Sequence, residues 1–270
     1  MSEEVVKARV EGEIAYLTLN RPEKRNAING QVLRAIPEAL AKADQPGVRA
    51  IILYGEGPVF SAGIDFTSFV GEGGILGGSG ERRADPSRFR FFIGESQAAL
   101  SRLESTEKPI IGALHGYVGG LGLELALACD ARVAAAGTRL GMPEVRIGLI
   151  PDVGGTTRLT RTVGYAWAKD LIMTARMIDA EEALRIGLVN RVVEPGGHLA
   201  AAEQLAREIA RNAPLAVGLA KRVIDRGHGL DKMTFMELEA LAQSSLLVTE
   251  DFAEGAQALA GRRDPKFKGR

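Results

Sequence analysis

Two carboxylates stand in a stretch of the chain that otherwise reads as buried. Residues 140–155, LGMPEVRIGLIPDVGG, are mostly apolar residues, glycine and proline, yet they include Glu144 and Asp152. An isolated carboxylate in such surroundings either costs several kcal/mol of stability or takes up a proton because its pKa rises. Groups of this kind are candidates for proton transfer.

Two glycine-containing turns offer main-chain amides for the same chemistry. One is FSAGID at 60–65, which follows a predicted strand at 49–55, and the other is GYVGGLG at 116–122, which follows a predicted strand at 109–114. Glycine lets a ligand approach the backbone closely, and helix N-termini favour negative charge. Two amides that converge from separate turns would form an oxyanion hole.

The glycine motifs do not match nucleotide-binding patterns. GLG at 120–122 begins like a dinucleotide fingerprint, but Leu125 occupies the position of the third glycine. The segment GEGGILGGSG at 71–80 lacks the Gly-Lys-Ser/Thr of a P-loop and is typical of a mobile loop. The turn that ends in GGTT at 154–157 predicts a helix start, with Asp152 or Thr156 near its cap.

The elements that must position these groups alternate between strand and helix, which predicts an α/β layered fold. The expected elements are two strands within 4–19, a helix at 30–43, a strand at 49–55, a helix at about 90–106, a strand at 109–114, a helix at 123–130 and a strand at 131–136.

The chain changes character after residue 195, where helix follows helix without a strand. We therefore expect a core at 1–195 and a helical region at 196–270. The helical region is rich in apolar side chains, which would either pack back onto the core or associate with other copies of the chain. They are Phe235, Met236, Leu238, Leu241, Leu246 and Leu247.

Composition narrows the class of protein. Hydrophobic residues make up 46% and charged residues 25%, as in globular proteins that bury a core. The 34 Lys and Arg residues balance the 34 Asp and Glu residues, so the chain has no net positive charge to attract nucleic acid or an anionic membrane. Cys129 is the only cysteine, and no His/Cys/Asp cluster has metal-ligand spacing. With no targeting peptide or apolar run of about 18 residues, we expect a cytoplasmic protein without a metal.

Several motifs, taken in order, resemble the crotonase (enoyl-CoA hydratase/isomerase) superfamily. They are LNRP at 19–22 with Asn26-Ala27, FSAGID at 60–65, GYVGGLGLELALACD at 116–130, MPEVRIGLIPDVGGTTRL at 142–159 and the terminal DPKFKG. The resemblance implies a spiral of ββα turns with a C-terminal helical region that builds homotrimers, often paired as hexamers. It also implies an acyl-CoA substrate, a place in fatty acid metabolism and no separate cofactor.

The resemblance implies that Glu124 and Glu144 are the catalytic pair of an enoyl-CoA hydratase, a lyase that adds water to trans-2-enoyl-CoA. Glu124 would activate the water and Glu144 would exchange the proton with the α-carbon, so the titrations of the two should be coupled. The amides of Ile64 and Leu121 would hold the thioester oxygen, although the family often has glycine where this chain has Leu121. On the residues alone, both glutamates could instead be helix-start carboxylates.

The resemblance further implies that Lys24, Ala27 and Ala62 contact CoA. Judged by charge alone, Lys24 and its neighbour Arg25 would instead belong to a solvated loop. Asp152 is a third acid, at a spacing that also occurs in relatives that isomerise dienoyl-CoA. It is somewhat more typical of a turn or helix cap. An enoyl- or dienoyl-CoA isomerase is therefore the alternative activity, and a catalytically silent binding oligomer is the alternative without an enzyme.

Overall fold

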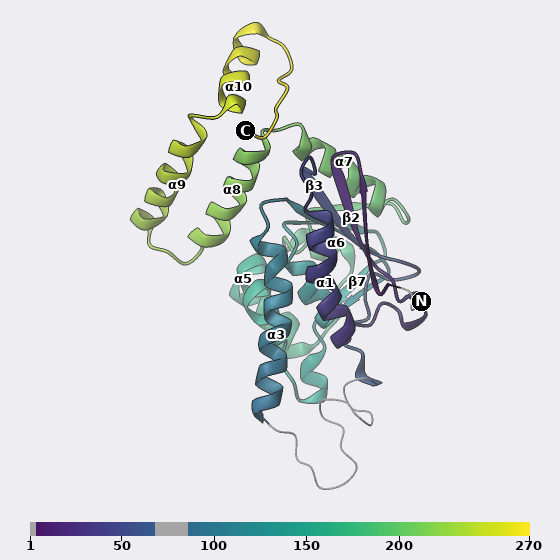
Figure 1. Cartoon of the computed structure of the whole chain (residues 1–270). Helices are drawn as coiled ribbons and strands as arrows, with labels where there is room; N and C mark the ends of the chain where they lie inside the picture. Colours follow the sequence, from purple (N-terminus) through teal and green to yellow (C-terminus); the bar gives the residue numbers. More distant parts are fainter. Residues whose placement is uncertain (1–3, 68–85) are drawn as a thin grey trace.

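The computed structural model describes residues 4–67 and 86–270, and its centre is a six-stranded mixed sheet (Figure 1). The strand order is β1-β2-β3-β4-β6-β8; β1 and β2 are antiparallel, and the remaining neighbours are parallel. The strands are β1 Val6–Glu11, β2 Ile14–Leu19, β3 Ala50–Gly55, β4 Ile110–Leu114, β6 Ala131–Ala135 and β8 Arg191–Val193. The glycine-rich segment 71–80 lies outside the described residues.

Helices cover both faces of this sheet, as an α/β sequence pattern predicts. On one face, α1 (Gly30–Ala43) packs against β1, β2 and α3 (Pro86–Ser105). Asn29 caps α1 by accepting from the Val32 amide, and the buried stripe of α1 meets the larger of two hydrophobic cores. On the other face, α7 (His198–Ala210) contributes Ala202 and Ala206 to the smaller core beside Ile52 of β3.

A second, two-stranded sheet was not expected from the sequence. It pairs β5 (Tyr117–Gly119) with β7 (Arg139–Gly141) in parallel, so part of the predicted turn at 116–122 is a strand. The pattern was missed because three residues are too few to show the alternation typical of strands. This small sheet ends at Gly119 and Gly141, immediately before α4 (Leu121–Leu127) and the 3₁₀ turn η2 (Glu144–Ile147).

The remaining helical segments are a 3₁₀ turn that precedes α1 and the helices that follow the small sheet. They are η1 Pro22–Lys24, α5 Gly155–Thr174, α6 Ala180–Arg185, α8 Pro214–Gly227, α9 Lys232–Leu246 and α10 Glu250–Gly261. Among the described residues, no helix is long and apolar enough to cross a membrane.

The region 196–270 is helical, as the sequence predicts, but its helices differ in their surroundings. Whereas α7 lies on the sheet, α9 and α10 extend away from it (Figure 1), and α8 is tied to the core through buried Lys221, which forms an ion pair with Asp130 at 2.9 Å. α9 contacts α8 and has no buried residue. The apolar side chains of α9 therefore do not pack back onto the core in the single chain; Leu241, for example, is 63% exposed. The boundary at residue 195 stays a prediction.

Candidate active site

Two turns meet where the sequence predicts an oxyanion hole. The turn at 60–65 is tied to the small sheet, because the Ser61 amide donates to the Tyr117 carbonyl and the Gly119 amide donates to the Ser61 carbonyl. Gly63 has a positive φ of 95°, and a Cβ there would lie 2.7 Å from the Gly119 carbonyl oxygen and 3.6 Å from the Leu121 nitrogen. Only glycine therefore permits this approach.

The amides of Ile64 and Leu121 are available at this junction. Leu121 is the first residue of α4, where amide groups have no partner within the helix. Neither amide donates a hydrogen bond within the described ranges 4–67 and 86–270. The helix N-terminus adds a partial positive charge, so the pair suits an oxygen that gains negative charge.

Glu124 is held by the start of another helix. It lies in α4 and is 2% exposed, and its Oε1 accepts from the amides of Val153 at 2.9 Å and Gly155 at 2.7 Å. Burial raises the pKa of Glu124 to about 8, assisted by the charge of Glu144 and opposed by the Gly155 hydrogen bond. Both amides donate to Oε1, so Oε2 has no hydrogen-bond donor in the part of the chain that is described.

Glu144 reaches the same place from η2. A Cβ on Gly120 would lie 2.8 Å from Glu144 Oε1, so the carboxylate stands against the turn that leads to Leu121. Glu144 Oε2 is buried and has no hydrogen-bond partner among the described residues. Burial raises the pKa of Glu144 to about 6, and the charge of Asp152 adds to the effect. Burying a hydrogen-bond acceptor without a partner costs free energy, and unsatisfied buried groups of this kind are found at functional sites.

The predicted helix start at 154–157 is confirmed, because α5 begins at Gly155, but neither Asp152 nor Thr156 is its cap. The N-cap is Gly154, which has no side chain to offer, and Glu124 takes the amides near this end instead. The Asp152 carbonyl accepts from Gln97 Nε2 at 2.6 Å. Burial raises the pKa of the Asp152 carboxyl, and its charge raises the pKa values of both glutamates.

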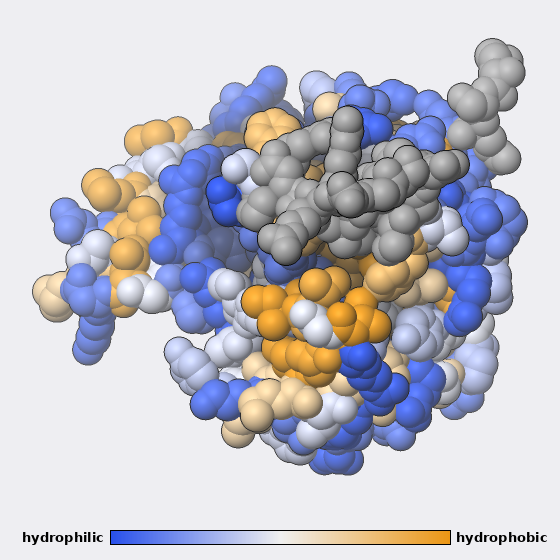
Figure 2. Space-filling view, turned by 90° about the horizontal axis from the view of Figure 1, so that it is seen from below, coloured by the Kyte–Doolittle hydropathy of each residue, from blue (hydrophilic) through white to orange (hydrophobic). Residues whose placement is uncertain are grey.

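One pocket of about 300 Å³ gathers these groups. It lies at the end of the molecule where α3 begins, and Figure 2 shows an apolar patch on the face seen from that end. Its polar and main-chain lining includes Ala62, Gly63, Ile64, Ser96, Gly120, Leu121, Glu124, Glu144, Arg146 and Asp152. Its apolar lining includes Phe66, Phe89, Phe92, Ile93, Ile147, Leu149, Ile150 and Val153. The predicted acids and amide donors thus share one cavity with an apolar wall.

The predicted CoA contacts lie beside this pocket. The Ala62 amide donates to the Arg25 carbonyl at 2.9 Å, and the Ile28 amide donates to the Gly63 carbonyl at 2.7 Å. These bonds place Ala27 next to the turn at 60–65. Lys24 is exposed at the end of η1, which is compatible with contact to an anionic group in solvent.

Two residues of the motif at 19–27 organise this loop, a role that the sequence did not reveal. Asn26 is buried with a φ of 52°; its side chain donates to the carbonyls of Glu56 and Val59 and accepts from the Arg21 amide. Arg21 also forms an ion pair with Asp65 at 2.9 Å. Asparagine tolerates the left-handed conformation, which was the available signal at Asn26.

Comparisons with known proteins agree with this geometry. Residues 9–270 match the enoyl-CoA hydratase/isomerase family. The short-chain-enoyl-CoA hydratase of Clostridium acetobutylicum is 39% identical, covering 94% of this chain and 93% of its own. The crotonyl-CoA hydratase of Syntrophomonas wolfei is 37% identical, covering 95% of each.

Solved structures show the same likeness. The enoyl-CoA hydratase of Bacillus anthracis has a TM-score of 0.89 at 32% identity, covering 98% of this chain and 100% of its own. That of Mycobacterium tuberculosis has a TM-score of 0.85 at 34% identity, with 99% and 100% covered. The chain belongs to the enoyl-CoA hydratase/isomerase family, and the expected crotonase fold is confirmed.

Proposed function

We propose that the chain is an enoyl-CoA hydratase that converts trans-2-enoyl-CoA into 3-hydroxyacyl-CoA. The observation that carries the proposal is the meeting of Glu124 and Glu144, from two different segments, in one pocket beside two amides that have no partner among the described residues. Relatives that are 37–39% identical and are named hydratases support it. Hydration changes no oxidation state overall, so the reaction needs no redox cofactor.

The reaction divides between the main chain and the two carboxylates. The amides of Ile64 and Leu121 donate to the thioester oxygen and stabilise the enolate that forms as water adds. Glu124 takes a proton from the water whose oxygen bonds to the β-carbon, and Glu144 gives its proton to the α-carbon. One water is consumed, and the single proton that the pair shares is passed from Glu124 back to Glu144 after each turnover.

This division requires a proton shift when the substrate binds. Burial raises the pKa values of both carboxyls, to about 8 for Glu124 and about 6 for Glu144, and we propose that the shared proton rests on Glu124 in the empty site. Hydration needs the proton on Glu144, so we propose that the bound water relays it. Donation from Val153 and Gly155 favours the ionised form of Glu124 and assists this transfer.

Crotonyl-CoA tests the activity directly. Incubation with the protein should remove the absorbance of the conjugated thioester, and Glu144→Gln should abolish that loss while CoA still binds. Tight CoA binding without turnover of any enoyl-CoA would favour a catalytically silent binding protein. Wild-type turnover by Glu144→Gln would refute the assignment of this residue.

Asp152 supports a second candidate activity within the family, the isomerisation of dienoyl-CoA. It lines the same pocket as both glutamates, and a third acid provides a place for a proton further along the acyl chain. Asp152→Asn should then be mild for crotonyl-CoA hydration and severe for dienoyl-CoA isomerisation. A severe loss of hydration would instead give Asp152 a part in the main reaction.

We further propose that CoA lies along Lys24, Ala27 and Ala62 and that the region 196–270 joins copies into a homotrimer or a dimer of trimers. The exposed apolar surface of α9 supports self-association, since α9 has no buried residue in the single chain. Sedimentation of the full chain tests the assembly: a monomer at micromolar concentration would refute it.

A further inference from the structure

The connector at 175–179, between α5 and α6, lies directly against the strand that leads to Glu144. Leu140 of β7 exchanges two main-chain hydrogen bonds with Ile178, at 2.9 and 2.8 Å. A Cβ on Gly141 would lie 2.5 Å from Met177 Sδ and 2.8 Å from the Arg176 carbonyl oxygen. The strand and the connector are therefore packed without space between them, and Glu144 follows Gly141 by three residues.

The same connector also supports the turn that leads to the Leu121 amide. The Gly120 amide, immediately before Leu121, donates to the Gly141 carbonyl at 2.9 Å. Tyr117, on the partner strand β5, places its hydroxyl 3.8 Å from Met177 Sδ. A displacement of the connector would thus reach both the oxyanion turn and Glu144 through the two-stranded sheet.

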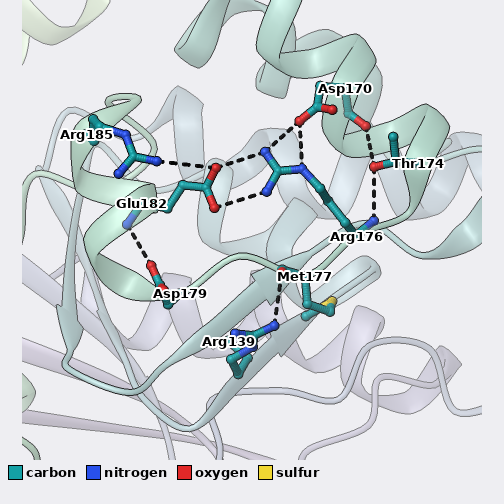
Figure 3. Close-up of polar contacts among 8 residues, drawn as sticks. All are labelled: Arg139, Asp170, Thr174, Arg176, Met177, Asp179, Glu182 and Arg185. Atoms are coloured by element: carbon teal, nitrogen blue, oxygen red, sulfur yellow. Dashed lines mark hydrogen bonds and ion pairs between the residues drawn. The ribbon is translucent and has the colours of Figure 1, made fainter.

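Arg176 fixes the connector to the helices on either side of it (Figure 3). Its Nε donates to Asp170 of α5 at 2.7 Å, and its two terminal nitrogens donate to the carboxylate of Glu182 in α6 at 3.0 and 2.9 Å. The Arg176 guanidinium lowers the pKa of Glu182 through these bonds. Bidentate pairs fix orientation as well as distance, unlike most surface ion pairs.

The backbone beside Arg176 needs such a restraint. Ala175 is buried and has a left-handed φ of 53°, a conformation that costs an alanine about 1–2 kcal/mol. Arg139 adds a bond from its guanidinium to the Met177 carbonyl at 3.0 Å, and Asp179 accepts the Glu182 amide at 2.8 Å. Figure 3 shows these contacts enclosing the connector from both sides.

From this arrangement we infer that Arg176 is a positioning residue for catalysis: its bridge between Asp170 and Glu182 fixes the connector that holds Glu144 and the Leu121 amide in register. The inference rests on the proposed hydratase function. Arg176 touches no reacting atom, so its loss affects the rate through misplacement of these groups and leaves CoA contacts intact. Misplacement of about 1 Å costs roughly 100-fold in rate.

The test compares Arg176→Met, Arg176→Lys and a control, Arg191→Met, in the full-length protein. Arg191 forms an ion pair with Glu208 at 2.7 Å, with 38% of its side chain exposed against 33% for Arg176, and it does not line the pocket. Arg176→Met should lower kcat for crotonyl-CoA about 10–100-fold with KM within about 3-fold. Arg176→Lys keeps the positive charge but cannot form the bidentate pair, so it should recover part of the lost kcat. The kcat of Arg191→Met should stay within about 2-fold of wild type.

Amide hydrogen exchange supplies a readout that does not depend on turnover. Arg176→Met should accelerate exchange at Leu140 and Gly120, whose amides bond to the connector and to β7, and Arg191→Met should not. Unchanged exchange, or a kcat loss equal to that of the control, would overturn the inference. A wild-type protein that hydrates no enoyl-CoA would instead refute the proposed function, while the exchange result would still decide whether Arg176 holds the site in register.

Discussion

The Glu124 carboxylate accepts the amide of Gly155 at 2.7 Å, although 31 positions separate the two residues in sequence. The N-terminus of α5 thus receives from Glu124 the acceptor oxygen that a capping side chain would ordinarily provide, because its N-cap is a glycine. The bond fixes one oxygen of a buried carboxylate and favours its ionised form against the effect of burial.

Gly155→Ala should disable this arrangement. A Cβ at this position would lie 2.5 Å from Glu124 Oε1 and 2.6 Å from Pro151 Cβ, so the carboxylate must move. We expect kcat for crotonyl-CoA to fall about 100-fold while CoA binding changes little.

The control for this substitution is Gly94→Ala in α3, where a Cβ would meet nothing within 4 Å. Alanine favours the helix by up to about 1 kcal/mol relative to glycine, so this variant should be at least as stable as wild type and fully active. Full activity in Gly155→Ala would show that the close approach of the two residues is dispensable.

The two raised pKa values predict a bell-shaped dependence of kcat/KM on pH. The reaction needs one carboxylate ionised and the other protonated, and the pKa values are about 6 for Glu144 and about 8 for Glu124. Activity should fall below about pH 6, where both are protonated, and above about pH 8, where both are ionised. A rate that stays flat from pH 5 to about pH 9 would exclude a shared proton.

Ionisation of Glu124 should also lower the free energy of unfolding as the pH rises. Its pKa is higher in the folded protein than in the unfolded chain, so the folded state binds more protons between about pH 4.5 and 8 and stability falls as pH rises through that window. Glu124→Gln can still accept from Val153 and Gly155 but cannot ionise. It should be more stable than wild type by roughly 2–4 kcal/mol near pH 8 and little different near pH 4.5, measured by urea unfolding.

Glu254→Gln is the matched control for this stability effect, because the sign is opposite. Donation from Arg263 lowers the pKa of Glu254 to about 2. Its charge therefore contributes stability above the unfolded pKa, and the glutamine variant should be less stable than wild type near neutral pH. An equal response of the two variants to pH would contradict the assigned pKa shifts.

The sequence was sufficient to predict α1 and to single out the two glutamates that line the pocket. The predicted helix at 30–43 coincides with α1, because its apolar stripe and Asn29 cap are local signals. The motifs around Glu124 and Glu144 located two acids that share a cavity, since the family resemblance carries tertiary information that periodicity does not.

Long-range contacts account for what was missed. The cap of α5 was assigned to Asp152 or Thr156 because local sequence cannot show that Glu124 approaches the same amides from α4. The strand β5 was read as a turn because its pairing partner lies 22 residues further on, with Tyr117 opposite Arg139. Arg176 was not singled out, since its importance comes only from the connector that it holds.

The most direct test of the account is the hydration rate of crotonyl-CoA by Glu124→Gln, Glu144→Gln and the double variant. If the two carboxylates act as one proton-transferring unit, each single substitution should cost about 10³-fold or more in kcat, and the double variant should fall no more than about 10-fold further. Losses that multiply in the double variant, or a single variant that retains wild-type kcat, would contradict a shared role for Glu124 and Glu144.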